Sequence, residues 1–153
     1  MNIDRELAEK VMGWELLKVG HFGTEYETPR QAGLEAWMNN CGLDSVGEYF
    51  IDEVRGFWIP VESWHPFTDI GQAFQVEKKM RKKHDFWLSL SYKTERRLDG
   101  KESHPEWWAR FRCVRGATRP DGYAHYDTLS EAICVAARMA VGTGRMTHKT
   151  EGL

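Results

Sequence analysis

Two segments in which apolar side chains recur at every second position constrain the fold of this chain more than any other feature. Large apolar side chains occupy every second position in 86–92, and the same period recurs in 107–114. A period of two places successive side chains on opposite faces of a β-strand. The polar residues 94–105 between the two segments predict a hairpin with a mobile tip. We expect its apolar face, including Leu88 and Phe111, to be sealed by helices.

Four amphipathic helices are predicted from capping residues and from apolar side chains spaced three or four positions apart. They cover roughly residues 4–12, 28–42, 69–84 and 128–142. Asp4 is the expected N-cap of the first helix and Asp69 of the third, where Gln72 is placed to complete a capping box. Thr128 and Glu131 form a second capping box at the start of the last helix.

Shorter strands are expected at 14–19 and within 48–59, the latter interrupted at Arg55-Gly56. Together with the hairpin and the helices, they predict an α+β fold with a short, mainly antiparallel sheet. A length of 153 residues fits one domain. We place that domain at 1–142 and expect a flexible C-terminal tail at 143–153.

The composition predicts a cytoplasmic globular protein. Apolar residues make up 41% of the chain, which is too apolar for disorder, yet no apolar run is long enough to span a membrane. The charged N-terminus has no signal-peptide pattern. Cys41, Cys113 and Cys134 lie far apart in apolar surroundings, as reduced core thiols do. Seven tryptophans are unusual, and they serve either as core bulk or as a binding surface.

Charge is divided unevenly along the chain. The net charge of −2 is composed of −9 in residues 1–77, +8 in 78–119 and −1 in 120–153. Such a division indicates either a dipolar surface for an anionic partner or self-complementarity between the two parts. Self-complementarity is the simpler interpretation, because the basic stretch is mixed with acidic residues and does not resemble a nucleic-acid-binding tail. We therefore expect no nucleic acid among the partners.

No catalytic or metal-binding motif is present in the sequence. The six histidines never fall four residues apart on one predicted helix; they are His21, His65, His84, His104, His125 and His148. Neither a Gly-x-Ser-x-Gly motif nor a phosphate loop occurs. Glu62 and Asp69 are placed to form a carboxylate pair, although helix capping explains Asp69 more simply. We therefore predict a protein that is not an enzyme and binds neither metal nor cofactor.

The polar side of the predicted hairpin carries the strongest binding signal. Arginine and tryptophan on one sheet face can stack on a base and contact phosphate oxygens. The candidate ligand-binding residues are Trp87, Trp108, Arg110 and Arg112 on the strands, with Arg96 and Arg97 in the connecting loop. The alternative is a solvated face on which arginine stems cover the tryptophans, and we favour it slightly.

Three segments together resemble the phage ABA sandwich domain family. They read RELAEKVMGW at 5–14, WHPFTDI at 64–70 and SEAICVAA at 130–137. In the family the central motif more usually reads Trp-Asn-Pro-Ser-Thr-Asp, so His65 and Phe67 depart from it. The resemblance implies a layered α/β/α sandwich and a phage or prophage origin. With the residue patterns, it predicts about four helices and a location in the host cytoplasm. It implies no established activity.

Two functional classes are therefore expected. The first is a phage accessory protein that binds a small anionic, nucleotide-like ligand, for example to sequester a signal used in host defence. The second is a protein–protein adaptor or inhibitor that acts on a host or phage protein. Homodimerisation is compatible with both, because a hairpin edge and exposed aromatic side chains offer a self-complementary patch.

Overall fold

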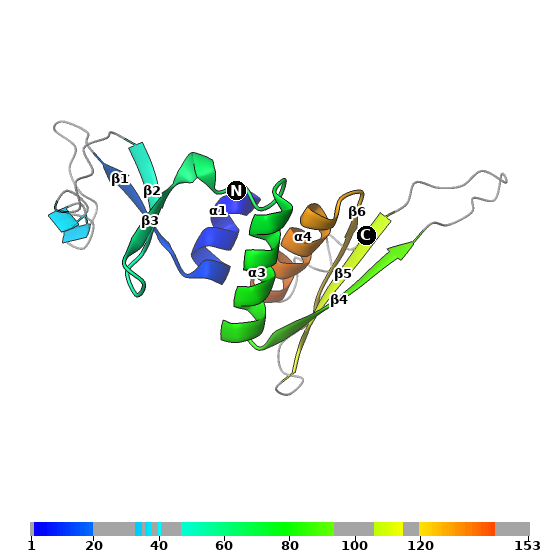
Figure 1. Cartoon of the computed structure of the whole chain (residues 1–153). Helices are drawn as coiled ribbons and strands as arrows, with labels where there is room; N and C mark the ends of the chain where they lie inside the picture. The colour runs from blue at the N-terminus through cyan, green and yellow to red at the C-terminus, as the bar shows by residue number, and fades with distance from the viewer. Residues whose placement is uncertain are drawn as a thin grey trace. The chain divides into compact units, whose positions relative to one another are not determined.

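The computed structural model describes residues 2–19, 33–34, 36–37, 40, 47–93, 106–114 and 120–142 (Figure 1). Its backbone divides into two compact units. The larger unit comprises Met1–Met12 and His65–Leu153, and the smaller unit comprises Gly13–Trp64. Mixed helices and antiparallel strands confirm the α+β class.

The sheet of the larger unit contains the predicted hairpin. β4 (Phe86–Lys93) pairs antiparallel with β5 (Glu106–Cys113), and Leu88 lies opposite Phe111. A third strand, β6 (Gly122–Tyr126), pairs with the other side of β5 and gives the order β4-β5-β6. β6 was not predicted, because its buried positions are Gly122 and Ala124 and it lacks the large apolar side chains of a typical strand. The predicted hairpin tip at 94–105 lies outside the described residues.

The described helices of the larger unit lie on one side of this sheet (Figure 1). They are α1 (Ile3–Glu6), continued by the π-helical turn η1 (Leu7–Met12), α3 (Ile70–Lys83) and α4 (Leu129–Val141). We call the side of the sheet that faces them the inner face and the opposite side the outer face. The described elements of the larger unit thus form two layers, and the predicted α/β/α layering and the fourth helix are not confirmed.

Helix α4 approaches the inner face closely because it is rich in alanine. A Cβ added to Gly122 would stand 1.8 Å from the carbonyl oxygen of Ala136 and 2.8 Å from the Cβ of Ala140. Phe86 and Phe111 are fully buried on this face. Leu90 and Tyr92 remain 39% and 54% exposed, so the prediction that helices seal the whole apolar side of the hairpin was wrong. The reason is that α4 packs mainly against β5 and β6 and leaves the far end of β4 uncovered.

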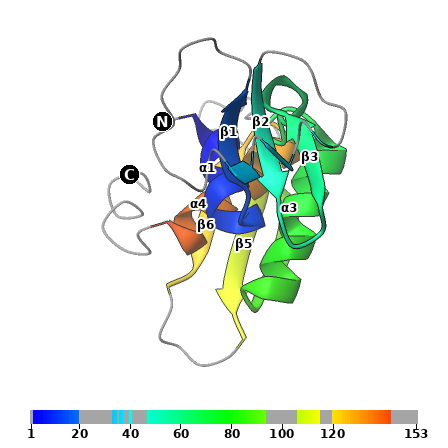
Figure 2. The ribbon, with the colours of Figure 1, turned by 90° about the vertical axis from the view of Figure 1, so that its left-hand side faces the viewer.

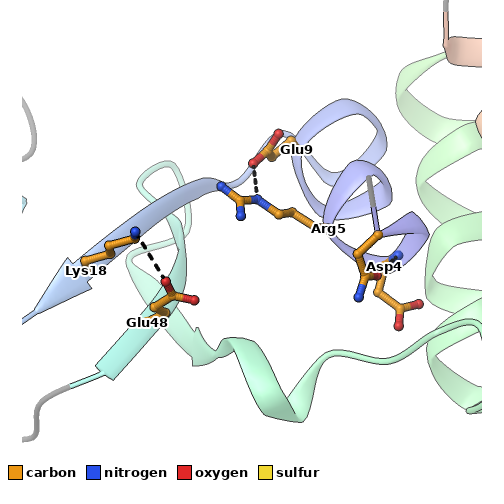
Figure 3. A network of polar contacts seen from close by, with 6 residues as sticks. Asp4, Arg5, Glu9, Lys18 and Glu48 are labelled. Carbon is orange, nitrogen blue, oxygen red and sulfur yellow. Dashed lines mark hydrogen bonds and ion pairs between the residues drawn. The ribbon is translucent and has the colours of Figure 1, made fainter. Parts of the chain in front are cut away.

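The first helix is capped differently from the prediction. Asn2 is its N-cap, and the Asn2 side-chain oxygen accepts a hydrogen bond of 2.8 Å from the Asp4 backbone N–H. The Asp4 carboxylate instead accepts a hydrogen bond of 3.0 Å from the backbone N–H of Phe67. Asp4 therefore links the N-terminal helix to the segment that leads into α3. Arg5 and Glu9 form an exposed ion pair along the same helix (Figure 3).

The other predicted caps are confirmed with one difference. Asp69 caps α3 by accepting a hydrogen bond of 3.0 Å from the Gln72 N–H. The Gln72 side chain, however, accepts a hydrogen bond of 2.6 Å from the His65 N–H. It therefore bonds the turn before α3 instead of the Asp69 N–H, which a capping box would require. At α4, Thr128 accepts from the Glu131 N–H and bonds the Glu131 carboxylate, and Gly142 follows the last turn.

The smaller unit contains a second three-stranded antiparallel sheet, whose strands lie side by side (Figure 2). Its strands are β1 (Glu15–Val19), β2 (Gly47–Asp52) and β3 (Phe57–Pro60), followed by the 3-10 turn η2 (Val61–Ser63). The predicted interruption at Arg55-Gly56 is confirmed, and Gly56 has a φ of 73° that favours glycine. Lys18 and Glu48 form a cross-strand ion pair (Figure 3).

Tryptophans supply much of the core of the smaller unit. Trp14 and Trp64 are buried, with ring centroids 4.7 Å apart, and Tyr49 meets Trp58 at 5.1 Å. Within the predicted helix 28–42, the described positions 33, 34, 36, 37 and 40 are helical, and Leu34 packs against Leu17 and Ile51. Much of the tryptophan surplus is therefore core bulk rather than binding surface.

Candidate binding face

The candidate site is the outer face of the sheet β4-β5-β6. Strand pairing places Trp87 opposite Arg112, and Ser89 opposite Arg110. The register of β6 then adds Tyr123 beside Arg110 and His125 beside Trp108. The predicted strand residues thus lie on one face, because alternate positions of three paired strands point the same way. Its members are Trp87, Ser89, Ser91, Lys93, Glu106, Trp108, Arg110, Arg112, Tyr123 and His125.

Asp121 forms ion pairs with both arginines of this face. One of its carboxylate oxygens accepts from Nη2 and Nε of Arg110 at 2.6 and 2.9 Å. The same oxygen lies 3.7 Å from Nε of Arg112. Two guanidinium groups therefore converge on one acidic oxygen, and a net charge of about +1 remains on the three groups. This carboxylate positions Arg110 through two hydrogen bonds, whereas Arg112 lies within ion-pair distance of it and stays 63% exposed.

Trp108 is flanked by other side chains of the same face. His125 stacks on its ring with centroids 4.6 Å apart and planes inclined by 20°. The ammonium group of Lys93 lies 4.6 Å from the ring centroid, within cation–π range. His125 also approaches the Glu106 carboxylate at 3.0 Å. The neighbours of Trp108 occupy surface on which a base would stack, so it contributes chiefly to the packing of the face.

Trp87 and Arg112 supply the most accessible part of the outer face. Trp87 is 55% exposed, and the Arg112 side chain is 63% exposed. They are direct cross-strand neighbours on the same face of the sheet, and the Arg112 guanidinium lies toward Asp121. Tyr123, which approaches Trp108 with a centroid distance of 5.5 Å, adds a third aromatic ring. Burial raises the pKa of Tyr123, and the nearby Arg110 partly offsets that rise.

Sequence reasoning did not single out Lys93 and Glu106 of this face. It also missed Tyr123, His125 and the adjoining Asp121. All three depend on β6, whose weak apolar pattern gave no strand signal. A hint was available in the alternation of Tyr123 and His125 with two small residues. Arg96 and Arg97, the predicted clamp, lie outside the described residues.

Other candidate chemical groups have structural roles where the structure describes them. Asp69 caps α3, and His84 contacts the carbonyl oxygen of Val11 at 3.0 Å. Cys134 is fully buried, and burial raises the pKa of its thiol with a smaller contribution from the Asp4 charge, which opposes nucleophilic reactivity. In the described segments, no three His, Cys, Asp or Glu side chains come together as a metal site requires. Nor does any described helix have the length and hydropathy to cross a membrane.

The larger unit is thus a two-layer α+β unit with helices on one side of the sheet and an aromatic, arginine-bearing face on the other. The chain belongs to the Phage ABA sandwich domain family, whose model matches residues 5–138. This match confirms the resemblance seen in the three sequence segments and associates the chain with phages. No curated protein and no solved structure matches the chain.

Proposed function

We propose that this chain is a non-catalytic phage protein that binds a partner protein through the outer face of the sheet β4-β5-β6. The observation that carries the proposal is the adjacent pair Trp87 and Arg112, both more than half exposed on a sheet face where helices pack on the other side. Tryptophan, tyrosine and arginine dominate the binding energy of protein interfaces, and Tyr123 completes that set here.

The shape and charge of the face favour a protein over a small molecule. Small-ligand sites are concave and bury most of the ligand surface. The outer face is instead a run of side chains that stand side by side on three strands. Its charges are also largely balanced within the face, because Asp121 engages both arginines and Glu106 engages His125. Such pre-positioned pairs fix the orientation of a partner at little cost in side-chain entropy.

The proposal is tested by affinity purification of the tagged chain from host cells carrying the phage. We expect a stoichiometric protein partner, and Trp87→Ala or Arg112→Ala to weaken its binding about 30-fold, as loss of a hot-spot residue of about 2 kcal/mol does. The matched control is Val54→Ala, which shortens a 97% exposed apolar side chain in the turn between β2 and β3. A partner lost equally from all three variants, or from none, contradicts the outer face as the binding surface.

A second candidate function is binding of a small anionic ligand such as a nucleotide, which is how the phage protein would sequester a host-defence signal. It is favoured by the convergence of Arg110 and Arg112 on one oxygen of Asp121, where a phosphate oxygen could take the place of that carboxylate. Thermal-shift screening with cyclic and linear nucleotides distinguishes the two functions. For an anion site, Asp121→Asn should strengthen the response and Arg112→Ala should abolish it. For a protein-binding face, the wild-type response to the nucleotide panel should be flat.

A further inference from the structure

Strand β4 forms one edge of its sheet and lacks the features that usually protect such an edge. The order β4-β5-β6 leaves the edge of β4 that points away from β5 without a partner strand in the described sheet. Residues 86–92 contain neither a charge nor a proline, and Trp87, Leu90 and Tyr92 are 55%, 39% and 54% exposed. Natural edge strands are normally blunted by charge, proline or bulges, because open backbone groups pair with other strands. An unprotected edge of this kind is a template for pairing with a strand of another chain.

The hydrogen-bond pattern identifies the backbone groups that face this edge. The Val114 N–H donates to the Asp85 carbonyl at 3.0 Å, which makes the two a bonded pair across β4 and β5. Bonded and non-bonded pairs alternate along an antiparallel ladder. The N–H and C=O groups that point away from β5 are therefore those of Phe86, Leu88, Leu90 and Tyr92. Within the described part of the chain, no backbone hydrogen bond is found on that side of Leu88, Leu90 and Tyr92.

We propose that β4 pairs antiparallel with β4 of a second copy of this chain, with the twofold axis at Ser89. Each three-stranded sheet would then become half of a continuous six-stranded sheet. In this register Leu88 lies opposite Leu90 of the second copy, and their backbone groups satisfy one another on both sides of the axis. A twofold interface of this kind is closed, so it produces a dimer rather than a filament.

The charges at the two ends of β4 favour a second copy in this register. Asp85 precedes the strand and Lys93 ends it, with seven uncharged residues between them. Antiparallel pairing about Ser89 brings Asp85 opposite Lys93 of the second copy, and the symmetry repeats this contact at the other end. Opposite charges directly across two strands stabilise their pairing, and like charges oppose it. A parallel arrangement would bring like charges together instead.

The side chains are also compatible with this register. Ser89 meets Ser89 of the second copy at the axis on the outer face, where small side chains allow close approach. Trp87 then lies beside Ser91 of the second copy, so the two outer faces would form one continuous surface with a Trp87 from each copy near its centre. The pairing itself does not rest on the proposed function. A single strand buries less area than standard interfaces do, so we expect a dissociation constant in the micromolar range.

Sedimentation velocity of the full chain over a concentration series tests the pairing. We expect a monomer–dimer equilibrium that Leu90→Pro abolishes, because proline removes a donor that faces the open edge and is not used in the ladder with β5. Leu90→Lys should weaken the dimer at least tenfold through charge repulsion at the axis, and it covers the case in which the proline variant fails to fold. A chain that stays monomeric up to several hundred micromolar overturns the proposal, as does a dimer that Leu90→Lys leaves intact.

Disulfide trapping tests the register. With the axis at Ser89, the two Ser89 residues form a non-bonded pair with Cα atoms about 4.5 Å apart, within disulfide range. Ser89→Cys should therefore give a covalent dimer under mild oxidation, above the background of the wild-type chain. The matched control is Ser91→Cys, an equally exposed serine on the same face, whose two copies would lie about 13 Å apart and should not crosslink. Crosslinking of Ser91→Cys in preference to Ser89→Cys overturns the register. The partner protein is assayed separately with Trp87→Ala, so a failed dimer and a failed binding face are distinguishable.

Discussion

Replacing Gly122 by alanine should destabilise the larger unit by about 3 kcal/mol, at the upper end of ordinary overpacking. The added Cβ would lie 1.8 Å from the Ala136 carbonyl oxygen, whereas ordinary contact begins at 3.4 Å, so β6 and α4 would have to separate by about 1.6 Å. For a chain of this length, the melting temperature should fall by about 6–12 °C. Differential scanning calorimetry and urea unfolding both measure the effect.

Two controls separate this cause from a general intolerance of substitution. Gly33→Ala makes the same chemical change at an exposed helical position where an added Cβ meets nothing within 4 Å, so stability should be unchanged or rise by up to about 1 kcal/mol. Adding Ala140→Gly to Gly122→Ala should recover little, because the shortest contact is to the Ala136 backbone rather than to the Ala140 side chain. Full recovery in that double variant, or a loss below 1 kcal/mol in Gly122→Ala alone, would refute the close approach of α4 to β6.

Three further predictions concern single side chains. Thr128→Ala removes the N-cap of α4 and should cost about 1 kcal/mol in urea unfolding, whereas Thr68→Ala on an exposed turn should cost much less. Asp4→Ala leaves the Phe67 N–H without its acceptor and should lower the free energy of unfolding by about 1–2 kcal/mol. The control Glu9→Ala breaks only an exposed ion pair and should lower it by under 1 kcal/mol. Equal losses in the two variants would argue against the Asp4 link. Cys134 keeps its proton in the folded state because burial raises the pKa of its thiol from 9.0. The contribution of this thiol to the free energy of unfolding is complete below pH 9. It is lost as rising pH ionises the thiol of the unfolded chain. Stability should therefore fall above pH 9 by up to about 1.4 kcal/mol per pH unit from this group, and Cys134→Ala should show a shallower fall.

The sequence predicted the elements whose physical signal is local. The alternation in 86–92 and 107–114 indicated two paired strands, and the structure pairs them with Leu88 opposite Phe111. Asp69 and Thr128 were recognised as caps because a side-chain oxygen at the start of a helix satisfies a backbone N–H two or three residues away. The interruption at Arg55-Gly56 was recognised because glycine readily adopts the positive φ that a tight turn requires. Each of these features is decided within a few residues.

Features that depend on packing between distant segments were predicted less well. β6 escaped prediction because its buried positions are small, and their small size is required only by the approach of α4. Asp4 was assigned as a cap, although its carboxylate bonds Phe67, sixty-three residues away. The candidate site shows the same division. Periodicity placed Trp87, Trp108, Arg110 and Arg112 on one face, but Asp121 and His125, which set the charge and the accessibility of that face, come from beyond the hairpin.

The sequence by itself thus determined most of the described strands and helices, the capping residues of α3 and α4, and the family to which the chain belongs. It could do so because strand period, capping and turn preference are interactions between near neighbours. The tertiary structure alone decided how much of the apolar face the described helices cover, that Leu90 and Tyr92 stay exposed, and that Asp121 reaches both arginines. Those outcomes depend on how far α4 extends across the sheet and on a third strand beside β5, which no local pattern encodes.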